Sequence, residues 1–142
     1  MNNEIKIMCQ DILNQSEEER LSLGNEAVRN MVRGFRDLGL NVEKTYQLIQ
    51  QLTRLFVSAD GKCGQKEFEF YKAVTGSKIS SDDFFDMTNY GKNEDFVDDI
   101  VDLMREADNK TRTATIIYGL ALMCHDGTLT VDEQKIIDRL LA

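Results

Sequence analysis

The sequence predicts an all-α fold, a single-domain bundle of about seven or eight helices. Apolar residues recur at steps of three and four through most of the chain, which is the period of a helix with one buried face. None of the 142 residues is proline, a residue that breaks helix interiors but is common in loops, so its absence favours helices with short connections. No segment alternates apolar and polar residues as a half-buried strand does.

Residues 1–40 are expected to form an N-terminal helical segment packed on the main domain. A first helix is predicted over residues 4–13, and a second begins after Ser16, which forms a capping box with Glu19 three residues later. Gly24 marks a place where this second helix could be interrupted. Gly39 is the expected stop, because glycine closes helices at little steric cost.

Residues 41–142 are expected to form the main domain. Asn41 caps a helix predicted over residues 42–59, and its inner face is predicted to carry Val42, Tyr46, Ile49, Leu52, Phe56 and Ala59. A helix over residues 65–74 should stop at Gly76, and Ser80 or Ser81 should cap a short one over residues 82–89. The remaining helices are expected from residue 93, over residues 110–125, and from Thr130 to the end of the chain.

The formal net charge of −8 narrows the range of partners. A chain of this charge repels phosphate backbones and anionic membrane surfaces, so nucleic acid is not an expected partner. A cation or a basic protein surface suits it better, and the alternative is that the charge only keeps the protein soluble. We expect a protein partner.

The cysteines and the hydropathy pattern point to a cytoplasmic protein. Cys9, Cys63 and Cys124 are widely separated, which is typical neither of a disulfide framework nor of a zinc site. Cys63 and Cys124 are expected to pack inward as small hydrophobic groups. No signal peptide is evident, and no apolar run approaches the ~20 residues that span a bilayer, so direct membrane insertion is not expected.

One short signature occurs twice. Asp60-Gly61 and Asp126-Gly127 each follow an apolar helix end, and each is followed after five residues by a glutamate, Glu67 or Glu133, at the third position of a new helix. The two copies therefore predict two pseudo-repeated helical halves.

The duplicated signature has two interpretations. In the first, Asp60, Glu67, Asp126 and Glu133 bind a divalent cation, calcium or magnesium, both of which prefer oxygen ligands, and Asp132 adds to the second cluster. In the second, Glu133 is only the reciprocal half of a capping box with Thr130, and the aspartates accept hydrogen bonds from loop amides. This interpretation explains Glu67 less well, because Gly64 offers no capping hydroxyl. An EF-hand is excluded, because its first ligand position would fall on Phe56 and on Leu122.

With these residues the chain resembles the tellurite-resistance TerB-like family over roughly residues 42–142. The resemblance implies an all-α fold of two related halves, a metal-binding acidic cluster at Asp60, Glu67, Asp126 and Glu133, and a role in a bacterial stress response. The chain departs from the family pattern at His125, where alanine is common, and at Cys63-Gly64, where an aliphatic residue and a capping hydroxyl are usual.

The sequence favours a non-enzymatic module. His125 is the only histidine and falls at a predicted helix end, where it suits the helix dipole. Cys124 beside it is not a catalytic partner, because neighbours on a helix point ~100° apart. The leading hypothesis is a cation-binding stress-response module, and the alternatives are a metal-independent interaction scaffold and a two-metal hydrolase. Further acidic runs, at Asp82-Asp83, Asp86 and Asp98-Asp99, are expected to be solvated helix faces or first-turn charges.

Overall fold

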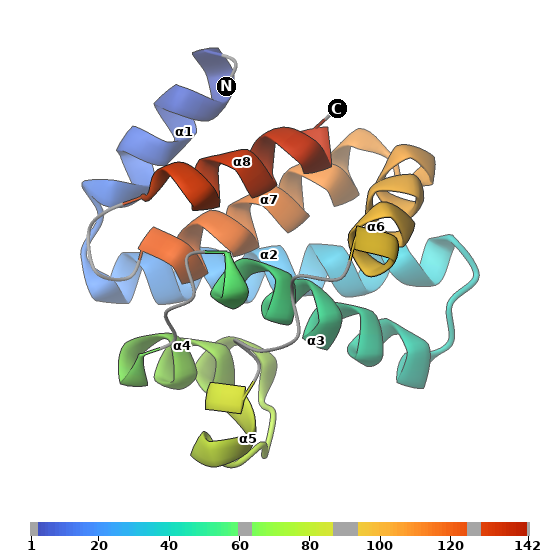
Figure 1. Ribbon diagram of the computed structural model, residues 1–142, viewed down its shortest axis with the longest axis horizontal. Coiled ribbons are helices and arrows are strands. Elements are labelled where there is room, and N and C mark those ends of the chain that lie inside the picture. Colours follow the sequence, from blue (N-terminus) through green and yellow to red (C-terminus); the bar gives the residue numbers. More distant parts are fainter. Residues whose placement is uncertain (1–2, 60–63, 87–93, 125–128, 142) are drawn as a thin grey trace.

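The computed structural model describes residues 3–59, 64–86, 94–124 and 129–141, and within these ranges the chain forms eight helices and no strand (Figure 1). The predicted all-α bundle is therefore confirmed. The helices are α1 (Asn3–Leu13), α2 (Glu17–Asp37), α3 (Val42–Ser58), α4 (Gln65–Thr75), α5 (Ser81–Phe85), α6 (Glu94–Glu106), α7 (Asn109–Met123) and α8 (Val131–Leu141). No helix in the described ranges is long and apolar enough to cross a membrane.

Helices α2 and α7 form the central antiparallel pair (Figure 1). At one end, Nη1 of Arg20 in the first turn of α2 donates to the carbonyl of Cys124, the residue that caps α7, at 3.1 Å. At the other end, Gly34 lies against Thr111 in the first turn of α7, and a side chain there would overlap the threonine. The missing Cβ therefore allows the two backbones to approach closely.

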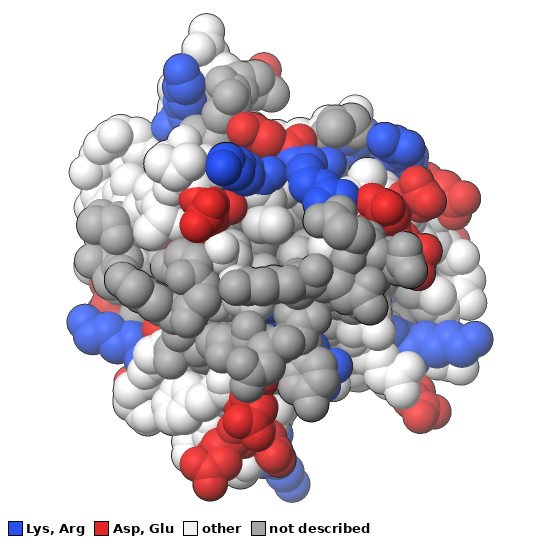
Figure 2. Space-filling view, in the orientation of Figure 1, with Lys and Arg blue, Asp and Glu red and all other residues white. Residues whose placement is uncertain are grey.

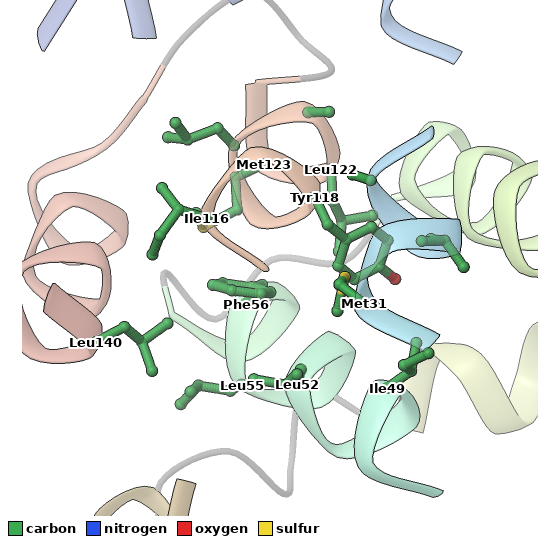
Figure 3. Close-up of a cluster of buried hydrophobic side chains, with 14 of the residues drawn as sticks. Met31, Ile49, Leu52, Leu55, Phe56, Ile116, Tyr118, Leu122, Met123 and Leu140 are labelled. Atoms are coloured by element: carbon green, nitrogen blue, oxygen red, sulfur yellow. The ribbon is translucent and has the colours of Figure 1, made fainter. Parts of the chain in front are cut away.

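The core surrounds α7. Every residue from 118 to 124 is buried, and α7 packs against α1, α2, α3, α4 and α8. Figure 3 shows Phe56 of α3 pointing toward α7, and a Cβ on Gly119 would lie 2.5 Å from that ring. The N-terminal segment shares this core, because Met31 and Phe35 of α2 belong to the same buried cluster. The boundary at residue 40 stays a prediction.

One buried hydroxyl pair joins α3 to α7. The hydroxyls of Thr53 and Tyr118 lie 2.6 Å apart, and Thr53 Oγ1 also donates to the carbonyl of Ile49 at 2.8 Å. Because a threonine hydroxyl carries one hydrogen, the Tyr118 hydroxyl must donate to Thr53. Burial raises the pKa of Tyr118, so this donor keeps its proton throughout the physiological pH range.

Most predicted helix ends are confirmed. Ser16 and Glu19 form the capping box that starts α2, with both hydrogen bonds at 3.1 Å. Asn41 Oδ1 accepts from the backbone of Lys44 at the start of α3, at 2.8 Å. Gly39 and Gly76 follow α2 and α4 with positive φ angles of 96° and 70°, the left-handed conformation that suits glycine.

Two predictions about helix extent differ from the structure. Gly24 does not interrupt α2. It makes room for a neighbour, because a Cβ there would lie 2.6 Å from the Phe70 ring of α4. Ser80 caps α5 as expected, but this helix ends at Phe85, and residues 87–89 of the predicted helix lie outside the described residues.

The predicted inner face of α3 is wrong at its first turn. Val42 and Tyr46 are 50% and 49% exposed, whereas Thr45 is fully buried. Apolar spacing cannot show where on the circumference the neighbouring helices will lie. Thr45 tolerates burial because its hydroxyl donates to the carbonyl of Asn41 at 2.8 Å.

Candidate functional site: two related helical hairpins

The duplicated signature lies between the helices of two successive pairs, α3–α4 and α7–α8, which we call the first and second hairpin. Helix α7 packs against α8, whereas α3 and α4 make few direct contacts. The second helices of the two hairpins match in length and position, since Gln65 and Val131 are 66 residues apart, as are Thr75 and Leu141. Glu67 and Glu133 are both the third residue of their helix. The second helices of the two pairs therefore have the same length and carry the glutamate at the same position, and the pseudo-repeat of two helical halves stays a prediction.

In the first hairpin, Glu67 caps the start of α4. Its Oε2 accepts a hydrogen bond from the backbone N–H of Gly64 at 3.0 Å. Gly64 has no side chain to return a bond, so this is half of a capping box. Glu67 is half-buried, and its cap bond is exposed to solvent.

In the second hairpin, Thr130 and Glu133 form the complete capping box that the sequence predicts. The Thr130 N–H donates to Glu133 Oε1 at 2.9 Å, and the Glu133 N–H donates to Thr130 Oγ1 at 3.2 Å. The side chain is well enclosed, since Glu133 is only 6% exposed. The structural interpretation of Glu133 is therefore confirmed as at least part of its role.

In each glutamate one carboxylate oxygen accepts the cap bond, Oε2 in Glu67 and Oε1 in Glu133. Asp60 and Asp126, the other two predicted ligands, lie outside the described residues together with Cys63 and His125. Asp132 is exposed and lies 4.0 Å from Nζ of Lys135. Within the described ranges no three histidine, cysteine, aspartate or glutamate side chains group as metal ligands.

The end of α7 carries a fixed positive charge. The Arg20 guanidinium donates to the carbonyl of Cys124, which lies two residues before Asp126 in the sequence. It stabilises the negative end of the α7 dipole. Glu67 of the first hairpin is more accessible to solvent than Glu133.

The other acidic runs are solvated, as predicted. Asp82, Asp83 and Asp86 are exposed, and Figure 2 shows acidic side chains gathered over α5. On α6, Asp98 and Asp99 are exposed, and Asp98 Oδ1 lies 2.8 Å from Nη2 of Arg139, which ties α6 to α8. Cys124 is fully buried, as expected for a small hydrophobic group.

A basic groove that we did not predict from the sequence lies between α2, the start of α3 and the end of α4. Its cationic residues are Arg29, Arg33 and Arg36 of α2, and Tyr46 of α3 also lines it. A signal was available, because arginines spaced four and three residues apart on a predicted helix share one face. The net charge of −8 instead favoured acidic side chains as the candidate functional residues.

Comparison of the chain with protein-family models, with curated proteins and with solved structures finds no match. The resemblance to the TerB-like family accordingly depends on the Asp-Gly-x5-Glu residues alone.

Proposed function

We propose that this protein is a non-enzymatic acidic helical module that binds a divalent cation through Asp60, Glu67, Asp126 and Glu133 and serves a cytoplasmic bacterial stress-response assembly, as the TerB-like resemblance implies. The observation that carries the proposal is the repeated hairpin. In both copies the glutamate occupies the third position of the second helix and is oriented by a backbone cap.

The cap gives each glutamate a defined position before any ligand arrives. A carboxylate whose rotamer is already selected by a hydrogen bond loses less conformational freedom on binding a cation. Aspartate and glutamate oxygens are the ligands of calcium and magnesium, and a chain of net charge −8 attracts either ion. Calcium tolerates irregular geometry better than magnesium, so calcium is the first ion to test.

The test is the melting temperature of chelator-stripped protein as calcium or magnesium is added. A cation bound only by the folded state stabilises it by about 2.7 kcal/mol at a hundredfold excess over Kd. Asp60→Asn and Asp126→Asn should reduce or abolish the rise. Asp83→Asn is the matched control, because it removes the same charge from an exposed position on α5.

If added cation still raises the melting temperature of both Asp60→Asn and Asp126→Asn, the ion binds elsewhere and the proposal is wrong. If millimolar calcium and magnesium cause no shift, the glutamates are helix caps only. That outcome would favour the second candidate, a metal-independent protein-interaction scaffold. The specific observation in favour of this second candidate is the arginine-lined groove.

A further inference from the structure

A groove of about 850 Å³ lies between α2, the start of α3 and the end of α4. Valines line it, and Val28 of α2 and Val74 of α4 are almost fully buried. Tyr46 also lines it, with half of its surface exposed. The size is typical of ligand sites, and the apolar lining offers a surface from which a bound group can exclude water.

Three arginines give the groove a charge opposite to that of the whole protein. Arg29, Arg33 and Arg36 are exposed along one face of α2, spread over about 10 Å of helix. Within the described residues none of them makes an ion pair or a side-chain hydrogen bond, and Asp37 is the one acidic residue lining the groove. The guanidinium donors are therefore available to a ligand.

We propose that this groove docks an acidic peptide segment of a partner protein, with carboxylates on the arginines and an aliphatic side chain on the valine floor. Arginine binds carboxylates through paired, planar hydrogen bonds, which favours a ligand with several carboxylates one helical turn apart. Tyrosine and arginine are the residue types that dominate binding energy at protein interfaces. The proposal does not depend on the cation.

The alternatives fit the groove less well. A small free anion would leave the valine floor and Tyr46 unused. A nucleic acid would bring many phosphates against a chain of net charge −8, which three arginines cannot offset at distance. The acidic helix α5 of a second copy fits poorly, because Phe84 is fully buried with its ring stacked on Tyr71, and Phe85 is packed against the core beside Phe68.

The test is fluorescence anisotropy with a labelled synthetic peptide of about 15 residues, a length at which an isolated helix starts to be stable. The peptide carries glutamates one turn apart with leucines beside them, and we expect saturable binding that weakens as salt is raised. Binding should survive chelator. Arg33→Gln should weaken it about tenfold, which corresponds to ~1.4 kcal/mol. Tyr46→Ala should also weaken it.

Arg105→Gln is the matched control, because it removes the same charge from an exposed position on α6. Equal losses from Arg33→Gln and Arg105→Gln would mean that only net charge matters, and would overturn the proposal. A peptide with serine in place of leucine should bind more weakly, and unchanged affinity would contradict a role for the valine floor. Thermal melts confirm that each variant is folded.

Two further outcomes would overturn the proposal. Absence of binding at high micromolar peptide would show that the groove does not hold an acidic segment. Concentration-dependent self-association that Arg33→Gln abolishes, measured by sedimentation, would identify a second copy of the chain as the occupant.

Discussion

The two hairpins have second helices of equal length, but their first helices, α3 and α7, differ in how much of their surface is buried. In α3 burial is limited to one face over the first half of the helix, where Glu43, Lys44 and Gln47 are exposed, and it extends all round only over the last turn, residues 55–58. In α7 burial extends all round the helix over its last two turns. A helix at the centre of a bundle needs apolar residues on every side, whereas one at the periphery needs a single stripe.

The caps at the starts of α4 and α8 also differ in burial, and the second hairpin is again the more buried. Thr130 and Glu133 form a complete box whose glutamate is 6% exposed. Gly64 and Glu67 form half a box on a more accessible surface. The length of the second helix and the position of the glutamate are thus common to both hairpins, and burial distinguishes them. Four predictions test this difference.

The largest expected effect comes from removing corresponding core side chains. Phe56→Ala in α3 and Leu122→Ala in α7 should cost about 3–5 and about 2–5 kcal/mol of unfolding free energy, because both side chains are almost fully buried. Urea denaturation measures the loss. Val131→Ala, at a position 66% exposed, is the control and should change stability by less than about 0.5 kcal/mol. A small loss at Phe56 alone would show that the first hairpin is weakly coupled to the core.

The next largest effect is a difference in the stability lost when each of the two capping glutamates is removed. Glu133→Ala should cost about 1–3 kcal/mol, because it leaves the Thr130 N–H without its partner in a partly buried site. Glu67→Ala should cost less than about 1 kcal/mol, because water can reach the Gly64 N–H. Denaturation midpoints of the two variants give the comparison. Equal losses would mean that the difference in burial has no energetic consequence.

A smaller effect follows from completing the first capping box. Gly64→Ser should stabilise the protein by a few tenths of a kcal/mol, because Gly64 already has the extended backbone of an N-cap, with φ −101° and ψ 173°. The added Cβ would lie 2.9 Å from Glu67 Oε2, the end of a side chain that can shift. Thermal melts of Gly64→Ser and Gly64→Ala separate the hydroxyl from the general effect of replacing glycine. If serine is no better than alanine, the hydroxyl forms no cap.

The smallest effect is a difference in how the N-caps of α3 and α7 contribute to stability as the pH falls. Asp108 caps α7, and hydrogen bonds from the side chain and backbone of Thr111 hold its pKa below the ordinary value. Its contribution to stability is present at neutral pH and is lost as pH falls through the lowered pKa, because the unfolded state then binds the proton more readily. Asn41, the cap of α3, does not titrate.

Asp108→Asn should therefore flatten the loss of stability between pH 6 and pH 2, near the ordinary aspartate pKa of about 3.9. Asn41→Asp should steepen it. Urea midpoints measured across this range provide the readout. Parallel pH profiles for the wild type and both variants would contradict the assignment.

Local signals account for what the sequence predicted well. The helix starts at Ser16, Asn41 and Thr130 and the stops at Gly39 and Gly76 depend on hydrogen bonds and backbone conformations within a few residues. The Thr130–Glu133 cap was predictable for the same reason, whereas the cap that Glu67 forms was not predicted, because Gly64 offers no hydroxyl for a capping box. Cation binding by the four carboxylates, by contrast, stays a prediction.

By itself, the sequence determined the helical class, most helix boundaries and the matching positions of Glu67 and Glu133 in the second helices of the hairpins, because periodicity and capping are properties of short segments. Only the tertiary structure decided which helix lies at the centre, and why Gly24, Gly34 and Gly119 are needed where neighbouring side chains crowd the backbone. The tertiary structure also placed Tyr46, half of whose surface is exposed to solvent, beside the arginines of α2. These features depend on contacts between residues distant in the chain, and apolar spacing carries no information about which helix faces which.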